Sequence, residues 1–184
     1  MRVSIIRLAS SIDALPWDSF IQSVPSTVSE SAKKVIEEER PFALAPHAYV
    51  DFSHKDRKSS IIWPGKEFPA VQLSFANGSS YYRQLKPLQY ALSQALSLNI
   101  GHVVLHTQND IAYKVATRKY NAKQELEIFK VLWRAMEAAD APVKARLVLE
   151  KGDDHSMVPK DPRLMTEREF AEEWATSIDR LRVL

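Results

Sequence analysis

The sequence predicts an α/β protein with a five-stranded mixed sheet flanked by helices, in the element order βββαβααβα, preceded by a strand and helix extension. Apolar residues alternate strictly over residues 70–75, as in a strand with one buried face. Residues 81–98 instead place apolar residues at three- and four-residue steps, which is typical of an amphipathic helix. Short apolar runs at 102–106 and 143–149 each follow helical stretches, and strands joined through a helix pair in parallel.

The composition excludes several classes of protein. The chain has 184 residues, of which 45% are hydrophobic, and it contains no cysteine. This hydrophobic content is that of a globular domain, so disorder is excluded as the main state. Without cysteine there is no disulfide framework, thiolate metal site or cysteine nucleophile. No apolar run approaches the roughly 20 residues of a membrane span, and the opening apolar stretch is too short for a signal peptide, so we expect a cytoplasmic protein without membrane contact.

Residues 1–45 form an N-terminal extension that has few large apolar side chains of its own. A short β-branched run over 2–8 predicts a strand. The segment 25–27 offers an N-cap, and 28–40 is rich in helix formers, so we expect a helix that ends before Pro41. We expect this extension to pack on the rest of the chain or on a partner.

Residues 46–184 form the main domain. Its first three strands are expected at 48–52, 59–63 and 70–75, joined by short turns into an antiparallel meander. The helix over 81–98 contains a proline, Pro87, which we place early in that helix, where a missing N–H costs least.

The second half of this domain alternates helices and strands. A loop over 151–165 precedes the last helix, where Thr166 and Glu169 form the pattern of a capping box. The remaining elements expected from the pattern are a strand at 102–106, helices at 110–118 and 123–139, and a strand at 143–149.

Five strings in this order resemble the ribonuclease H family, and the resemblance covers residues 46–184. The family has an aromatic-x-Asp-Gly-Ser string in its first strand, Glu-Leu in its first helix, Thr-Asp-Ser at the end of its fourth strand, Val-Lys-Gly-His before its catalytic loop, and Ala-Asp-x-Leu-Ala in its last helix. The corresponding strings of this chain are Tyr49 to Ser53 (YVDFS), Gln84 and Leu85 (QL), Leu105 to Asn109 (LHTQN), Glu150 to Asp153 (EKGD), and Ala171 to Ala175 (AEEWA).

The resemblance implies a ribonuclease H fold and a specific activity. Members of the family cleave the RNA strand of an RNA–DNA hybrid with two Mg²⁺ ions that are held by four carboxylates. Asp51 and Glu172 match the first and last carboxylates and are the candidate metal ligands, but Gln84 and Gln108 replace the other two. Amide oxygens are neutral and bind cations more weakly, so we expect a broken two-metal site and no cofactor, with Mg²⁺ required only if the site is active.

Other side chains near these positions leave alternatives open. Phe52 replaces the family's glycine, and Asp153 replaces its loop histidine. Asp110 could serve as a shifted ligand, although an acidic residue that begins a helix is more often explained by the helix dipole. His102 and His106 lie on one side of their strand, either as a metal pair or as hydrogen-bonding residues. The residues that could replace the family's loop histidine are Asp153, Asp154 and His155.

The net charge of +2 hides a local basic stretch that contains no acidic residue. Lys and Arg side chains bind phosphates without sequence specificity, and tyrosines stack on bases or sugars, so we predict contact with nucleic acid, against the alternative of a solvated helix face. The predicted contact residues are Lys114, Arg118, Lys119, Tyr120 and Lys123, with Tyr113 among them, together with Lys55, Arg57 and Lys58 in the turn after His54.

Three functional hypotheses follow. The first is a catalytically degenerate ribonuclease-H-like domain that binds nucleic acid or acts as a scaffold in a nucleic-acid-processing assembly, with RNA, an RNA–DNA hybrid or a protein as its partner. The second is an active metal-dependent nuclease that uses Asp51, Asp110 and Glu172. The third is a protein–protein adaptor or inhibitor that uses the fold only as a platform.

Overall fold

The computed structural model describes residues 29–53, 55–151 and 158–182 of the chain. Contacts divide the chain into two compact units, residues 1–45 and 46–184. The predicted strand over 2–8 and the predicted cap at 25–27 lie outside the described residues. Among the described helices, none combines the length and the apolar character needed to cross a bilayer.

The described part of the first unit is helix α3 (Glu30–Ala43). Its N-cap is Ser29, whose hydroxyl accepts a hydrogen bond from the backbone N–H of Ala32. The helix continues through Pro41, so our prediction that it ends before this proline is wrong. A proline removes one hydrogen bond to the preceding turn but has a helical φ angle, and the last turn of the helix therefore remains helical.

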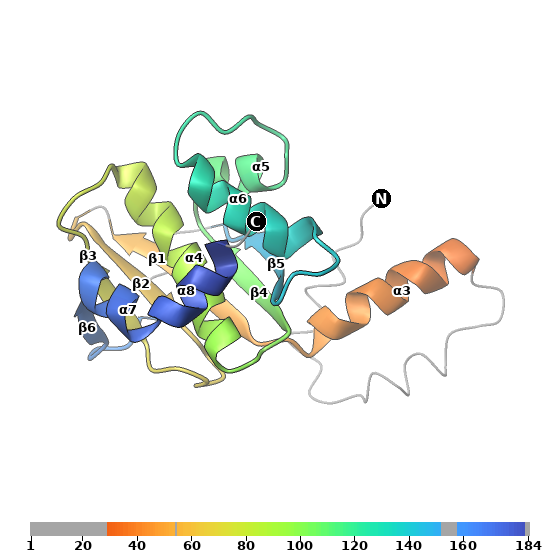
Figure 1. Ribbon diagram of the computed structural model, residues 1–184, viewed down its shortest axis with the longest axis horizontal. Coiled ribbons are helices and arrows are strands. Elements are labelled where there is room, and N and C mark those ends of the chain that lie inside the picture. Colours follow the sequence, from red (N-terminus) through yellow and green to blue (C-terminus); the bar gives the residue numbers. More distant parts are fainter. Residues whose placement is uncertain (1–28, 54, 152–157, 183–184) are drawn as a thin grey trace. The chain divides into compact units, whose positions relative to one another are not determined.

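The second unit is built on one mixed sheet, which Figure 1 shows with its strands labelled. The strand order across the sheet is β5-β4-β1-β2-β3-β6. The predicted antiparallel meander of β1, β2 and β3 is confirmed, as is the parallel pairing of β4 with β1 and of β5 with β4. The strands are β1 (His47–Ser53), β2 (Lys58–Ile62), β3 (Val71–Ser74), β4 (His102–Thr107), β5 (Lys144–Leu149) and β6 (Arg163–Thr166).

The sheet has six strands, so the predicted number of five is wrong. The additional strand, β6, occupies the end of the segment that we predicted as a loop, and it pairs in parallel with β3. The N–H of Arg163 donates to the carbonyl of Ala70 at 2.8 Å. With four residues, of which only Met165 is buried, β6 is too short for its alternation to be recognised in the sequence.

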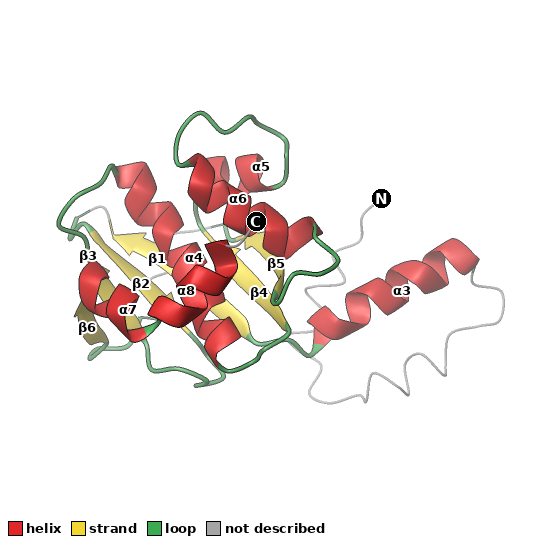
Figure 2. Cartoon of the chain, viewed as in Figure 1, coloured by secondary structure: helices red, strands yellow, loops and turns green. Residues whose placement is uncertain are grey.

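The helices of this unit cover one face of the sheet, as Figure 2 shows. The predicted capping box is present, since Thr166 and Glu169 each bond the other's backbone N–H. The last helix, predicted as one, is divided at Trp174 into two. The helices are α4 (Ser80–Ser97), α5 (Asp110–Ala116), α6 (Leu126–Glu137), α7 (Glu167–Glu173) and α8 (Ala175–Arg182).

The core lies between these helices and the sheet. The strand side chains that enter it include Ile61, Leu73 and Leu105, each with no exposed area. From the helices, Leu92 of α4 and Phe129 of α6 are equally buried. One contiguous apolar cluster therefore holds the helices on this face.

Pro87 lies in the middle of α4, not early in the helix as we predicted. A proline has no N–H to donate to the carbonyl four residues earlier, which here belongs to Arg83. The hydroxyl of Ser59 on β2 donates to this carbonyl at 2.5 Å. The strand thus supplies the hydrogen bond that the proline removes, which explains why the helix tolerates Pro87 in its interior.

The direction of each strand determines which strand ends lie at the same edge of the sheet. β2 is antiparallel to β1 and β3, whereas β4, β5 and β6 run in the same direction as β1 and β3. The carboxyl ends of five strands therefore lie along one edge, here called the carboxyl edge. In open α/β sheets, ligands bind at the carboxyl ends of the strands.

Because side chains alternate along a strand, the sheet also has a second face, which points away from the core helices. We call it the polar face, since most of its side chains can form hydrogen bonds. Its residues are His47, Tyr49, Asp51 and Ser53 of β1, Lys58, Ser60 and Ile62 of β2, Gln72 and Ser74 of β3, His102, Val104 and His106 of β4, Lys144, Arg146 and Val148 of β5, and Leu164 and Thr166 of β6.

Candidate functional site

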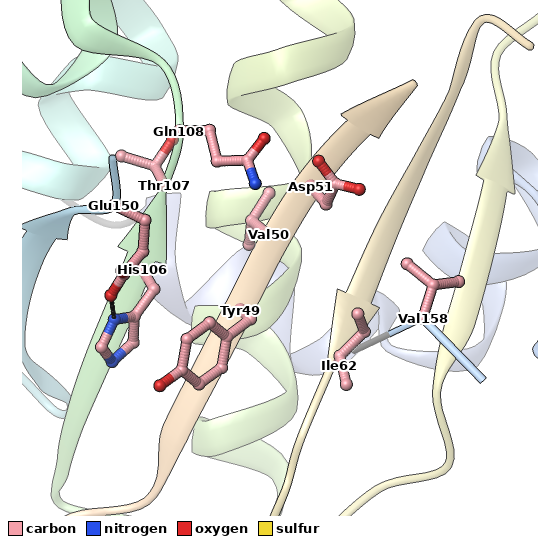
Figure 3. A pocket seen from close by; sticks show the side chains of 9 residues that line it. All are labelled: Tyr49, Val50, Asp51, Ile62, His106, Thr107, Gln108, Glu150 and Val158. Atoms are coloured by element: carbon pink, nitrogen blue, oxygen red, sulfur yellow. Dashed lines mark hydrogen bonds and ion pairs between the residues drawn. The ribbon is translucent and has the colours of Figure 1, made fainter. Parts of the chain in front are cut away.

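A small cavity lies on the polar face, between β1 and its neighbours β2 and β4 (Figure 3). Its volume is about 30 Å³, which is enough for one or two water molecules or a single ion but not for a nucleobase. The residues that line it are Tyr49, Val50, Asp51, Ile62, His106, Thr107, Gln108, Glu150 and Val158.

The strand register explains how these residues come together. Tyr49 and Asp51 project from the same face of β1, and Tyr49 pairs with His106 of the parallel strand β4. Gln108 directly follows the end of β4, and Glu150 directly follows the end of β5. Since both strands end at the carboxyl edge, these two polar side chains reach the same cavity.

A chain of hydrogen bonds runs through the centre of the site. His106 is almost fully buried, and its Nδ1 lies 2.5 Å from Oε1 of Glu150. Its Nε2 lies 2.7 Å from Nδ1 of His47. A carboxylate only accepts hydrogen bonds, so His106 carries its proton on Nδ1 and accepts at Nε2 from the Nδ1–H of His47. The ring of Tyr49 stacks on His106 at a centroid distance of 4.0 Å.

Burial keeps both imidazoles of this chain neutral near pH 7. Burial lowers the pKa of His106, and the hydrogen bond that His106 donates to Glu150 opposes this change without reversing it. Burial likewise lowers the pKa of His47, against the opposing charges of Glu67 and Glu150. At this pH the contact between His106 and Glu150 is therefore a hydrogen bond that the neutral imidazole donates to the carboxylate. Burial also raises the pKa of the Tyr49 phenol.

Of the four predicted metal-ligand positions, the cavity brings together two. Asp51 and Gln108 lie at the same end of it in Figure 3, and Oδ1 of Asp51 accepts from the N–H of Phe52 at 2.7 Å. Gln84 does not line the cavity, and its amide oxygen accepts from the side chain of Asn109. The amide of Gln84 thus links α4 to the segment after β4.

Glu172 is not brought to this site. It lies on α7, which packs against β6, and its carboxylate pairs with Arg168 at 2.7 Å on the exposed side of the helix. β6 is the third strand from β1, a separation of about 14 Å at the usual strand spacing. Asp110 begins α5 and pairs with Lys114 at 2.5 Å, so it has a role within its own helix.

The other predicted ligands do not assemble around one ion either. His102 and His106 lie on the same side of β4, as predicted, but four residues of strand separate them by about 13 Å. Within the described ranges, no group of three or more His, Asp or Glu side chains could hold a metal ion. Asp153, Asp154 and His155 lie outside these ranges, as does His54.

The predicted basic residues fall into two groups. Arg118 and Lys114 are engaged within the protein: Arg118 pairs with Glu137 through two hydrogen bonds of 3.0 Å, and its guanidinium lies 3.6 Å from the ring centroid of Trp133. These contacts are made by a residue with a left-handed backbone conformation, with φ of 60°, two residues after the end of α5. They attach α5 to α6, a role that the charge pattern does not reveal.

The second group remains accessible at the carboxyl edge. Lys55 and Arg57 are exposed in the turn between β1 and β2, and Lys58 follows at the start of β2. Lys119, Tyr120 and Lys123 are exposed in the segment between α5 and α6. Figure 1 shows both segments at the same end of the sheet.

Three residues of the cavity region were not predicted as site residues, namely Glu150, Tyr49 and His47. Two signals point to them in retrospect. His47, Tyr49 and Asp51 alternate along one strand and therefore share a face. Glu150 follows its strand as Gln108 follows the neighbouring one, so parallel pairing alone places both at one edge.

Comparisons of the chain with protein-family models, with curated proteins and with solved structures gave no match.

Proposed function

We propose that residues 46–184 form a ribonuclease-H-like domain that binds RNA or an RNA–DNA hybrid without cleaving it by the two-metal mechanism, as part of a nucleic-acid-processing assembly. The arrangement of the strands supports the relationship: an antiparallel meander is followed by two parallel strands, with the element order that the resemblance implies up to β5.

The observation that carries the proposal is the fate of the four metal-ligand positions. Among these four positions, only Asp51 supplies a carboxylate to the cavity at the carboxyl edge. Gln108 contributes a neutral amide, Gln84 bonds Asn109, and Glu172 is paired with Arg168 on α7. The second carboxylate at the cavity, Glu150, accepts from His106 instead.

This donor set does not fit two Mg²⁺ ions. Mg²⁺ prefers oxygen ligands, mainly carboxylates and water in octahedral geometry, and two such ions in one site require several negative charges. Here two carboxylates face a cavity of about 30 Å³, and a hydrogen bond from a buried histidine already occupies one of them. These residues therefore do not supply the set of carboxylate ligands on which the family's reaction depends.

Binding is supported by the cations that remain accessible. Lys55 and Arg57 in one turn and Lys119 and Lys123 in one loop lie at the carboxyl edge and are exposed. Tyr120 is 55% exposed beside them; the ammonium of Lys114 lies 5.3 Å from its ring centroid, and the other face of the ring is offered for stacking. Phosphate contacts of this kind dominate sequence-independent affinity.

Fluorescence anisotropy with labelled RNA and with an RNA–DNA hybrid tests the proposal. We expect affinity to fall steeply as salt increases, and to fall about tenfold or more when Lys55 and Arg57, or Lys119 and Lys123, are replaced together by Glu. Lys66→Glu is the matched control, because Lys66 is exposed in the β2–β3 connection, away from the carboxyl edge.

Two outcomes would replace the proposal with an alternative. Hybrid cleavage that requires Mg²⁺ or Mn²⁺ and is lost in Asp51→Asn would establish a nuclease with a shifted site. Absence of any salt-dependent affinity for RNA or hybrid would favour the adaptor hypothesis, in which the domain binds only proteins.

A further inference from the structure

A second, larger hollow lies on the polar face, across strands β2, β3 and β6. Its volume is about 280 Å³, close to the lower limit for small-molecule sites and sufficient for one nucleobase. It is separate from the cavity described above, since no residue lines both. The residues that line it are Lys58, Gln72, Ser74, Leu164, Met165, Thr166 and Glu169.

The register arranges these side chains in rows across three strands. Lys58 pairs with Ser74, which pairs in turn with Thr166. In the next row Gln72 pairs with Leu164. The side chains of Ser74 and Thr166 are short and leave space above the sheet, whereas Lys58, Gln72 and Leu164 around them are longer.

Three polar side chains of the hollow have no partner among the described residues. No hydrogen bond or ion pair within the described ranges involves the ammonium of Lys58, the amide of Gln72 or the hydroxyl of Ser74. Converging polar groups that the protein itself does not satisfy are the usual mark of a ligand site. Glu169 differs from them, because its carboxylate accepts from the N–H and the hydroxyl of Thr166 at 2.7 and 2.9 Å.

We propose that this hollow receives one unpaired nucleotide of the bound strand, an inference that rests on the proposed nucleic-acid binding. The amide of Gln72 can donate to and accept from the edge of a base, as amides do in base recognition. Leu164, which is 67% exposed, offers an apolar surface for the face of the base. Lys58 provides the charge for the adjacent phosphate.

The positions of Lys58 and Glu169 determine how the nucleotide is oriented in the hollow. Lys58 stands on the β2 side of the hollow, and Glu169 stands on the opposite side, at the start of α7. The phosphate therefore lies towards β2, and the base lies over β3 towards Leu164. Lys58 is adjacent to the turn that carries Lys55 and Arg57, so a strand gripped at the carboxyl edge can continue into the hollow.

The test compares two probes of the same RNA sequence, the single strand and the blunt-ended hybrid that it forms with complementary DNA. The duplex offers phosphates but no unpaired base. The single strand carries one 2-aminopurine, whose fluorescence changes when the base leaves its neighbours. We expect Gln72→Met to weaken single-strand binding by about tenfold and Leu164→Ala by about fivefold. Both variants should leave the affinity for the duplex unchanged.

Leu98→Ala is the matched control, because Leu98 is another exposed leucine, at the end of α4. The inference is overturned if the two hollow variants bind the single strand as well as the wild type, or if they lose affinity for both probes equally. If neither probe binds the wild-type protein, the proposed function itself fails. If both bind and only the charge reversals at the carboxyl edge matter, the proposed function stands and the hollow has no part in it.

Discussion

The two faces of the sheet use the same strands in opposite ways. On the helix-covered face, side chains such as Leu73 and Leu105 are completely buried in one apolar cluster. On the polar face, their chain neighbours Gln72 and His106 line a hollow and a cavity. Burial of apolar area on one face supplies the stability, and this leaves the other face able to carry groups that contribute little to it.

The two faces also differ in how the polar side chains on them are hydrogen-bonded. On the covered side, the hydroxyl of buried Ser59 donates to the carbonyl of Arg83, and the amide oxygen of buried Gln94 accepts from Trp63, whereas the amide nitrogen of Gln94 has no partner among the described residues. On the polar face, the cluster around His106 is bonded, whereas Gln72 has no partner among the described residues. The covered face is thus expected to respond to substitution through folding, and the polar face through binding.

The largest effect should come from the core. Leu73→Ala removes a completely buried side chain and leaves a cavity, so we expect the free energy of unfolding to fall by about 2–5 kcal/mol. Leu164→Ala, on the next strand but 67% exposed, should change it by less than about 0.5 kcal/mol. Urea denaturation followed by circular dichroism measures both. Equal losses would mean that the polar face is also part of the core.

The next effect concerns two adjacent serines that point to opposite faces of β2. Ser59→Ala leaves the carbonyl of Arg83 without a donor inside the core, which should cost about 1–3 kcal/mol. Ser60→Ala, on the polar face, should cost less than about 0.5 kcal/mol, because Ser60 is buried but its hydroxyl makes no hydrogen bond within the described residues.

A double-mutant cycle shows whether this cost arises from Pro87. In Pro87→Ala the residue regains an N–H that can donate to Arg83, so Ser59→Ala should cost less in this background than in the wild type. If the two substitutions are additive, Ser59 stabilises the protein in some other way.

A smaller effect should appear as a dependence of stability on pH, and it belongs to the polar face. Burial lowers the pKa of His106 and of His47 below the usual 6.5, so the unfolded chain binds more protons than the folded one in this range. The free energy of unfolding should therefore decrease as the pH falls from about 7.5 to about 5.5. The charges of Glu150 and Glu67 act on this pair, and the ring of Tyr49, another titratable group, stacks on His106.

Urea titrations across this pH range measure the dependence. The variant His47→Asn with His106→Asn should show a shallower slope. His102→Asn should remove only the contribution of one separate histidine, whose pKa is also lowered, by burial and by the charge of Lys144. A rise in stability on acidification would contradict the assignment, since it would show that His106 is charged and forms an ion pair with Glu150 in the folded protein.

Much of the covered face could be predicted from the sequence, because its side chains follow simple periods. Leu73 alternates with polar neighbours, and the leucines of α4 recur at helical spacing. β6 could not be predicted in this way, because four residues are too few to establish a period. The position of Pro87 was misjudged because its cost depends on Ser59, a residue distant in the sequence.

The candidate site was predictable only where one strand determines it. Gln108 follows a recognisable strand, and the resemblance assigned Gln108 and Asp51, which lies within β1, to the same site. Glu150 lies at an equivalent strand end, but the resemblance directed attention to Glu172 on the last helix. Pairing between His47 and His106 depends on sheet register, which sequence patterns do not specify.

The smallest effect should follow from Asp51→Asn. This variant tests whether Asp51 holds a metal ion or only contributes a negative charge near the bound nucleic acid. The asparagine can keep the bond to the N–H of Phe52 through its amide oxygen, so stability should be nearly unchanged. Removing one negative charge near the bound phosphates should leave RNA affinity unchanged or raise it by about twofold at low salt. Asp56→Asn is the control, because it removes the same charge from the exposed turn after β1. Similar effects of the two variants mean that Asp51 acts by charge alone, whereas a loss of affinity in Asp51→Asn that appears only with Mg²⁺ would show that the carboxylate holds a metal ion.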